Sequence, residues 1–373
     1  MSTQAHLVVM AAGTGGHIMP GLAVADEMKR RGWTVSWLGT ATGMENRLVP
    51  PHGIPLDTLS FSGLRGKNKV ETIFGGLRLL KAFADCWKIL KNRQADAVLG
   101  MGGYVCFPGG VMSAARGLPL VMVNADAGLL LSNRALLPIT DVLACGFDGP
   151  AAQHKVARVT GNPVRAEIEA IAPPEQRYAG RTGPLRVLVV GGSLGAKPIN
   201  DVIPAALAKI PAGQRPIVTH QTGMANLEAV KADYVKHGLN PASDAEVLPF
   251  INNMAQRLAE CDVIVCRAGA ITVSELCAAG VPGILVPFVV STTDHQRDNA
   301  VYMHEHGAGI HLPQPELNAE ALARQIQSLD RATLQGMAVK ARQLARLQSA
   351  AAVADAIEAQ VKKPIQKKKA SQA

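Results

Sequence analysis

The residues of this sequence that can do chemistry gather at three glycine-rich turns. These turns are Gly13-Thr14-Gly15-Gly16-His17, Gly191-Gly192-Ser193-Leu194-Gly195, and Gly269 with the segment Ala270 to Glu275 after it. A glycine turn that opens a helix presents unpaired N–H groups and the positive end of the helix dipole to an anion. Each turn is therefore a candidate phosphate site, although each can equally be a tight strand-to-helix turn without a ligand.

The spacing within the turns narrows the choice of ligand. A dinucleotide-binding fingerprint needs Gly-x-Gly-x-x-Gly and an acidic residue at the end of the second strand, whereas the first turn has a different spacing and that strand ends in Leu38-Gly39-Thr40. A Walker A loop needs Gly before its Lys and Ser or Thr after it, whereas the segment Gly192 to Pro198 has Ala196 before Lys197 and Pro198 after it. NAD binding and ATP hydrolysis are both disfavoured.

Two side chains beside the turns are suited to work on a nucleotide sugar. The imidazole of His17 can take a proton from a hydroxyl, hydrogen-bond a phosphate, or cap its own turn. Glu275 can accept hydrogen bonds from ribose hydroxyls, but the helix dipole alone also favours a glutamate near a helix start. Spacing alone favours this second, structural interpretation of Glu275.

Composition sets the class of protein. The chain has 373 residues, 48% of them hydrophobic and 18% charged, which predicts two folded domains. The net charge of +9 indicates attraction to phosphorylated substrates, an anionic membrane surface or a polyanion, and aromatic residues at 4% argue against nucleic acid. The six cysteines include no Cys-x-x-Cys and are expected to be reduced core residues of a cytosolic protein. No signal peptide is apparent.

The turns must be positioned by strands and helices. Short apolar runs alternate with amphipathic segments, which predicts βα units and parallel sheets, with strands near 7–11, 34–38, 97–100, 120–123 and 141–144. The pattern stops at Gly161-Asn162-Pro163 and begins again at 186–190. We therefore predict an α/β protein with two Rossmann-like domains facing each other across a cleft, residues 1–163 and 164–361, and a disordered basic tail at 362–373.

A basic amphipathic segment lies in the first predicted domain. Between Lys67 and Arg93 basic residues outnumber Glu71 and Asp85, and apolar residues such as Phe74 recur at helical spacing. Such a helix can rest on an anionic membrane surface or bury its apolar stripe on its own domain. The two interpretations are compatible if one end of the apolar stripe stays exposed while the rest is buried.

Five ordered motifs together resemble one family. The segments 13–17, 100–105, 161–165, 191–196 and 267–275 are similar, in order and spacing, to the MurG family of glycosyltransferases, and the resemblance covers the chain except its basic tail. It implies the GT-B fold and a peripheral protein at the cytoplasmic face of the inner membrane. It also implies inverting transfer of N-acetylglucosamine from UDP-N-acetylglucosamine to the 4-hydroxyl of the N-acetylmuramoyl unit of lipid I, which gives lipid II for peptidoglycan synthesis.

The resemblance also implies roles for single residues. In the second domain it implies that Arg165 binds the donor, that Ser193 lies near the UDP phosphates, and that Ile251 lies beside the uracil. It further implies that Glu275 binds the ribose and that Gln296, with His295, binds the sugar hydroxyls. The residues it implies along the nucleotide are Ala270, Ile271, Thr272, Val273 and Ser274. In the first domain it assigns Thr14, Gly15 and Gly16 to the sugar and diphosphate, and His17 to the acceptor side of the reaction.

The sequence departs from the family after its fifth predicted strand. Family members commonly have His-Glu-Gln-Asn where this chain has Val123-Asn124-Ala125-Asp126. Asn124 cannot be a base. Asp126 can be a base, a donor-binding acceptor of a hydroxyl, or a cap of the next helix. The proton acceptor thus stays open between His17, Asp126 and solvent. Leu194 also stands where the family often has Gln.

No cofactor or metal is expected. Asp-x-Asp does not occur in the sequence, so the leaving diphosphate is expected to be stabilised by N–H dipoles at helix starts. The expected partners are UDP-N-acetylglucosamine, lipid I, an anionic membrane surface and other cell-wall synthesis enzymes, without nucleic acid.

Two further hypotheses remain. Another GT-B enzyme, either a sugar-nucleotide epimerase or a transferase acting on a soluble glycan, would share the glycine turns and Glu275 without needing the basic amphipathic segment. A non-catalytic scaffold that binds nucleotide sugars is suggested by the altered segment Val123 to Asp126.

Overall fold

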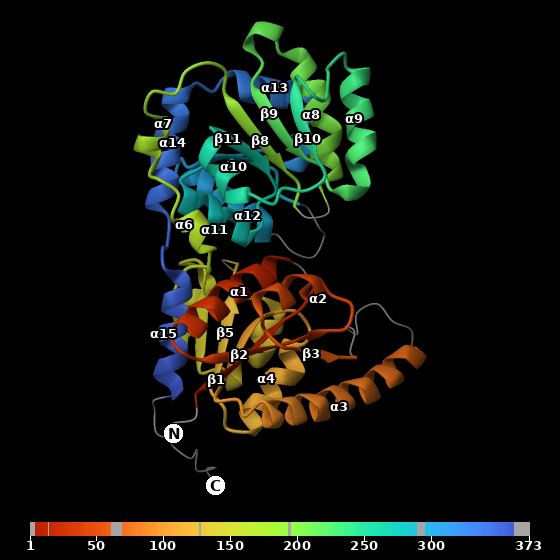
Figure 1. Ribbon diagram of the computed structural model, residues 1–373, viewed down its shortest axis with the longest axis vertical. Coiled ribbons are helices and arrows are strands. Elements are labelled where there is room, and N and C mark those ends of the chain that lie inside the picture. Colours follow the sequence, from red (N-terminus) through yellow and green to blue (C-terminus); the bar gives the residue numbers. More distant parts are fainter. Residues whose placement is uncertain are drawn as a thin grey trace. The chain divides into compact units, whose positions relative to one another are not determined.

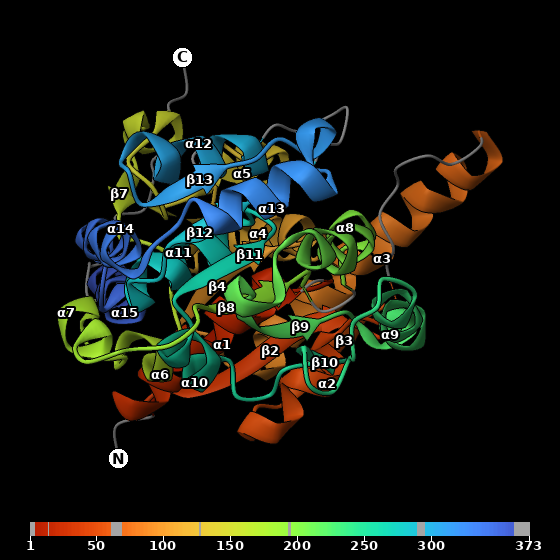
Figure 2. The same ribbon diagram turned by 90° about the horizontal axis from the view of Figure 1, so that it is seen from above.

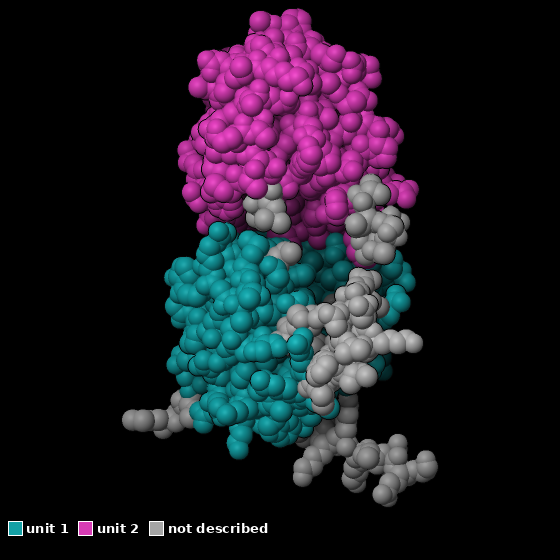
Figure 3. Space-filling model, turned by 90° about the vertical axis from the view of Figure 1, so that its right-hand side faces the viewer, with its two compact units in different colours: residues 1–164, 348–373 teal, residues 165–347 magenta. Residues whose placement is uncertain are grey.

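The computed structural model describes residues 4–13, 15–60, 69–126, 128–192, 195–288 and 295–361, with the backbone alone for 69–77 and 131–132. Thr14, Ser193, Leu194 and the tail 362–373 lie outside the described residues. The chain divides into two compact units, coloured separately in Figure 3. One contains residues 1–164 and 348–373, and the other contains residues 165–347.

The first unit is built on a seven-stranded sheet with strand order β3-β2-β1-β4-β5-β6-β7, and every pairing in it is parallel. Its strands are β1 (His6–Ala11), β2 (Thr34–Thr40), β3 (Leu56–Leu59), β4 (Ala97–Gly102), β5 (Leu120–Asn124), β6 (Val142–Cys145) and β7 (Ala157–Val159). Its α-helices are α1 (Gly15–Arg30), α2 (Glu45–Leu48), α3 (Lys69–Asn92), α4 (Cys106–Ala115), α5 (Leu131–Leu136) and α15 (Ser349–Val361).

Both faces of this sheet are covered by helices, as Figures 1 and 2 show. Because successive side chains of a strand point to opposite faces, Val9 and Trp37 pack with α1 and α15, while Val8 and Met10 pack with α3 and α4. Burial on both faces explains why the strands read as continuous apolar runs.

The second unit is built on a six-stranded sheet with order β10-β9-β8-β11-β12-β13, again parallel throughout. Its strands are β8 (Arg186–Val190), β9 (Ile217–Gln221), β10 (Ala245–Leu248), β11 (Val263–Cys266), β12 (Gly283–Leu285) and β13 (Gly309–His311). Its α-helices are α6 (Ala166–Glu169), α7 (Pro174–Tyr178), α8 (Lys197–Lys209), α9 (Leu227–Lys236), α10 (Met254–Glu260), α11 (Ala270–Ala279), α12 (His295–Glu305), α13 (Ala319–Gln327) and α14 (Arg331–Gln343).

The predicted α/β class with two parallel sheets is confirmed. The predicted domain division differs from the observed units in where it places the last helix, α15. Sequence analysis placed residues 164–361 in one domain, whereas the units divide after Val164 and α15 belongs to the first unit. Val353 and Ile357 of α15 are fully buried in the core of the first sheet. Arg31 Nη1 lies 2.6 Å from Asp355 Oδ1. These contacts join segments more than 300 residues apart, which no local pattern reveals.

Two features of composition can now be checked. All six cysteines are buried free thiols, as expected for core residues. Burial raises the pKa of the Cys106 and Cys266 thiols to about 12, so both are protonated at neutral pH. Within the described residues, no helix combines the length and the apolar character needed to cross a bilayer.

Candidate functional site

Among the predicted donor residues that the structure describes, Ile251, Gln296 and the segment 270–275 follow the carboxyl ends of strands in the second sheet. Because all strands are parallel, the turn after β8, the loop after β10 and the start of α11 after β11 all follow carboxyl ends of strands. Ligands of open parallel sheets bind at this edge. The strand β8 is a direct neighbour of both β9 and β11, which brings its turn between the other two segments.

The turn after β8 needs glycine for steric reasons. Gly192 and Gly195 have φ angles of +85° and +79°, in the left-handed region that side chains disfavour. A Cβ on Gly195 would also collide with the carbonyl oxygen of Thr222. The backbone of Gly195 therefore approaches Thr222 closely, and the Gly195 amide donates to the Gly192 carbonyl at 2.9 Å.

Helix α11 begins where the sequence predicted. Its N-cap is Gly269, in an extended conformation, and its first helical hydrogen bond runs from the Val273 amide to the Gly269 carbonyl. The N–H groups of the first turn have no partner within the helix. The Ser274 hydroxyl donates to the Ala270 carbonyl at 2.9 Å, which leaves the acceptor capacity of its oxygen.

The structure brings Arg165 and Glu275 together. Both Nε and Nη2 of Arg165 lie 3.2 Å from Oε1 of Glu275, and only 22% and 16% of the two side chains are exposed. Burial raises the pKa of the Glu275 carboxyl, and Arg165 opposes that rise without cancelling it. Glu275 is thus a shielded acceptor aligned by a guanidinium, and not only a glutamate placed by the helix dipole.

Two further predicted donor residues are Ile251, in the loop after β10, and Gln296, in the first turn of α12. Ile251 is 5% exposed and follows Phe250, which is 44% exposed. The side-chain oxygen of Gln296 accepts a hydrogen bond of 2.9 Å from the Phe288 amide, so its NH₂ group is the part that can face a ligand. Arg267 stacks on the Phe288 ring, with its guanidinium carbon 5.3 Å from the ring centroid.

The first glycine turn is held by a residue that sequence analysis did not single out. Glu45 is fully buried, and its carboxylate accepts hydrogen bonds from the Thr40 amide and hydroxyl at 2.7 and 2.6 Å and from the Gly13 amide at 3.2 Å. The Gly13 amide is therefore already used. Among the glycines of this turn, Gly15 and Gly16 at the start of α1 remain candidates for an anion.

His17 rests against the end of β4. A Cβ on Gly102 would meet the imidazole ring at 2.6 Å, so only glycine leaves room for it. His17 Nδ1 lies 3.3 Å from the Ala12 carbonyl oxygen. A carbonyl can only accept, so this contact puts the hydrogen of a neutral imidazole on Nδ1 and the lone pair on Nε2.

Asn124 is the last residue of β5 and Asp126 lies in the loop after it, at the same edge of the first sheet as His17. The Asn124 side chain donates to the carbonyls of Asp126 and Gly128 and accepts from the Leu130 amide and from Asn133. It therefore organises the loop. Helix α5 begins only at Leu131, without a side-chain cap, so Asp126 does not cap it. Asp126 and His17 follow β5 and β1, which β4 separates.

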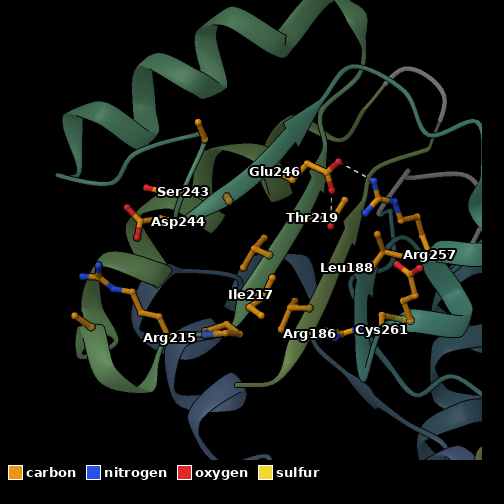
Figure 4. A pocket seen from close by; sticks show the side chains of 17 residues that line it. Arg186, Leu188, Arg215, Ile217, Thr219, Ser243, Asp244, Glu246, Arg257 and Cys261 are labelled. Carbon is orange, nitrogen blue, oxygen red and sulfur yellow. Dashed lines mark hydrogen bonds and ion pairs between the residues drawn. The ribbon is translucent and has the colours of Figure 1, made fainter. Parts of the chain in front are cut away.

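A hollow of about 530 Å³ lies elsewhere in the second unit (Figure 4). Arg186, Ile217 and Glu246 line it, near the amino ends of β8, β9 and β10. Arg257 pairs with Glu246 at 2.7 Å. The hollow contains none of the predicted site residues. No group of three or more His, Cys, Asp or Glu able to hold a metal ion occurs among the residues the structure covers.

An exposed apolar and basic surface lies on the first unit, where α3 extends outward (Figures 1 and 2). Leu80, Trp87 and Phe107 are 65%, 43% and 37% exposed. The Arg116 guanidinium lies 5.0 Å from the Trp87 ring centroid. The opposite stripe of α3, including Cys86 and Leu90, is buried in the core, so part of the helix packs on its own unit. Phe74 lies in the segment described by backbone alone.

The chain matches known proteins along nearly its full length. Residues 7–141 match the N-terminal domain of glycosyltransferase family 28, and residues 186–359 match its C-terminal domain. A UDP-N-acetylglucosamine--N-acetylmuramyl-(pentapeptide) pyrophosphoryl-undecaprenol N-acetylglucosamine transferase of Methylibium petroleiphilum is 64% identical over 97% of this chain and 99% of its own. The transferase of the same name from Chromobacterium violaceum is 61% identical, over 94% and 96%.

A solved structure extends the comparison to the fold. The crystal structure of Acinetobacter baumannii MurG aligns with a TM-score of 0.79 at 35% identity, covering 95% of this chain and 99% of that one. This likeness supports the GT-B fold for the two parallel-sheet units. The chain therefore belongs to glycosyltransferase family 28, within its MurG group.

Proposed function

We propose that this protein transfers N-acetylglucosamine from UDP-N-acetylglucosamine to the 4-hydroxyl of the N-acetylmuramoyl unit of lipid I, with inversion. In this reaction the bond from the anomeric carbon to the UDP oxygen breaks, a bond to the acceptor oxygen forms, the hydroxyl proton passes to a base, and UDP leaves. The observation that carries the proposal is the 64% identity, over 97% of the chain, to a transferase named for this reaction.

The donor is proposed to bind at the carboxyl edge of the second sheet. Glu275, aligned by Arg165, would accept the ribose hydroxyls, and Ile251 would lie beside the uracil. Ser193 and the amides of its turn and of Ala270 to Thr272 would face the diphosphate. Gln296 would use its NH₂ group on the sugar, because its oxygen is taken by the Phe288 amide.

Charge on the leaving diphosphate is the main electrostatic demand of this reaction. Fixed N–H dipoles at helix starts stabilise such charge without having to reorganise. The turn after β8 and the start of α11 supply them in the second unit. Thr14, Gly15 and Gly16 are proposed to add amides from the first unit, where Glu45 fixes the turn by holding Gly13.

His17 is the proton acceptor that the geometry favours. Its contact with Ala12 leaves the Nε2 lone pair available, and a neutral imidazole can act as a general base toward a hydroxyl. Asp126 is the alternative base or a donor-binding acceptor. Asn124 stands where the family commonly has Glu and is engaged on four sides by its own loop.

The acceptor is a membrane lipid, and α3 is proposed to bring the protein to the cytoplasmic face of that membrane. Exposed Leu80 and Trp87 would enter the interface, while Lys81, Lys88 and Arg116 would attract anionic headgroups, each contributing about 1 kcal/mol. Vesicles rich in anionic lipid should bind the protein at low salt, and Leu80→Glu with Trp87→Glu should abolish this binding. Val235→Glu, at a 63% exposed site of the second unit, is the matched control.

The transfer itself is tested with labelled UDP-N-acetylglucosamine and a lipid I analogue. The proposal predicts a labelled disaccharide product and one UDP for each transfer. An epimerase would convert the donor without any acceptor, a soluble-glycan transferase would ignore the lipid I analogue, and a scaffold would release no UDP. Any of these three results would contradict the proposal. Cell-wall synthesis enzymes remain proposed partners, testable by co-purification.

A further inference from the structure

We infer that Gln221 is a positioning residue that couples the base-binding and phosphate-binding parts of the donor site. This inference rests on the donor site proposed above. Gln221 is the last residue of β9, and its side chain is 2% exposed. Neither the sequence motifs nor the proposed reaction assign it a role.

The two hydrogens of the Gln221 amide go to two different loops. Nε2 donates to the Gly192 carbonyl at 3.0 Å and to the Pro249 carbonyl at 3.3 Å. Gly192 belongs to the turn proposed for the diphosphate, and Pro249 begins the loop that carries Ile251. One buried amide group therefore ties the phosphate turn to the uracil loop.

The position of β9 makes this link possible. In the sheet, β9 lies between β8 and β10, so its carboxyl end separates the turn after β8 from the loop after β10. A side chain with two donors at this end can reach both loops. An ionised glutamate would present only acceptors to the two carbonyls, and methionine has no N–H group to donate to either of them.

The next residue connects the same two segments through its backbone. The Thr222 amide donates to the Leu248 carbonyl at 2.9 Å. The Thr222 carbonyl, which lies against Gly195, accepts from Asn200 at 2.9 Å and from Asn226 at 3.2 Å. The backbone thus holds the end of β9 in place, and Gln221 projects from this fixed point.

The consequence is specific to a ligand that uses both loops at once. UDP would occupy the turn and the uracil loop together, so its affinity depends on their relative placement. ADP keeps the ribose and diphosphate but carries a different base, and uridine lacks the phosphates. Loss of the link should weaken UDP binding and leave the binding of ADP and of uridine nearly unchanged.

The test is to measure the affinities of UDP, ADP and uridine for the full-length protein and for Gln221→Met and Gln221→Glu. Loss of two neutral hydrogen bonds should weaken UDP binding about 5- to 30-fold, while ADP and uridine change by less than about twofold. Thr219→Val, on the same strand, removes a 3.2 Å contact to Glu246 away from both loops and should change none of the three affinities.

Two results would overturn the inference. Equal weakening of UDP and ADP would mean that Gln221 only shapes the phosphate turn, and unchanged UDP affinity in both variants would remove its role altogether. Thermal unfolding shows whether each variant is folded. Gln221→Glu keeps the inference testable if Gln221→Met does not fold. Failure of the wild-type protein to prefer UDP over ADP would instead refute the proposed donor site, and the coupling with it.

Discussion

The ion pair of Arg165 and Glu275 offers a quantitative test of the donor site. The perturbations are Arg165→Met, Glu275→Gln and the double variant, each of which keeps the approximate shape of the side chain. At an effective dielectric constant of about 20, unit charges 3.2 Å apart attract by about 5 kcal/mol. Desolvation of two side chains that are mostly buried offsets much of this, so we expect a net coupling of about 1–3 kcal/mol.

The expected effects on UDP binding follow from the role of the carboxylate. Glu275→Gln replaces charge-assisted hydrogen bonds to the ribose, worth about 1.5–3 kcal/mol, which should weaken UDP about 10- to 150-fold. Arg165→Met should weaken it as well, because Glu275 loses the guanidinium that aligns it. In the Glu275→Gln background, Arg165→Met should weaken UDP binding much less than it does in the wild type.

The pH dependence of UDP binding gives a second, independent readout. Burial raises the pKa of Glu275 and Arg165 opposes that rise, so removing Arg165 raises the pKa further. The carboxylate is the form with the stronger acceptors, and UDP affinity should therefore fall as the pH is lowered through this pKa. In Arg165→Met the fall should begin at a higher pH than in the wild type.

Isothermal titration calorimetry with UDP, across pH, measures all of these quantities. Lys231→Met is the matched control, because its ion pair with Glu228 is exposed and lies in the same unit. It should change UDP affinity by less than about twofold. Strict additivity of Arg165→Met and Glu275→Gln, or wild-type UDP affinity in Glu275→Gln, would refute the reasoning.

The remaining predictions concern catalysis and stability. His17→Ala should lower kcat by at least about 100-fold if His17 is the general base, and a loss of less than about tenfold, with a large loss in Asp126→Asn, would transfer that role to Asp126. His220 is buried and its pKa is lowered to about 4, so the unfolded state takes up its proton first. Stability should therefore fall by about 3 kcal/mol from pH 6.5 to about 4, and urea titrations should show a flatter profile for His220→Gln. Asp262 is fully buried, and Asp262→Ala removes the carboxylate partner of the partly buried Arg181 and Arg331, so it should destabilise the second unit by about 3–5 kcal/mol in the same assay. A loss of unfolding free energy below about 1 kcal/mol would contradict a stabilising role for the ion pairs of Asp262 with Arg181 and Arg331.

Local signals in the sequence were enough to predict much of the architecture. The strands alternate with helices as expected, and α11 begins directly after Gly269, because an apolar run followed by a glycine turn that opens a helix can be recognised without distant information. Glycine turns were also predictable, since positive φ angles such as that of Gly195 restrict the residue type locally. In the first unit, strands β3 and β7 were missed because they are short and not fully apolar.

The contacts that give the site its properties depend on strand order, which the sequence pattern does not contain. Arg165 meets Glu275 across 110 residues. Glu45 holds Gly13 because β2 lies next to β1. Gln221 reaches two loops only because β9 lies between their strands. Such partners can be inferred only once the sheet is known.

The central claim is that the carboxyl edge of the second sheet binds the nucleotide of the donor. A crystal structure of the protein with UDP tests it most directly. We predict the uracil beside Ile251, the ribose hydroxyls on the Glu275 carboxylate, and the diphosphate at the turn from Gly191 to Gly195 and the start of α11. UDP bound away from Glu275 and from that turn, for example in the hollow lined by Arg186 and Ile217, would contradict the account.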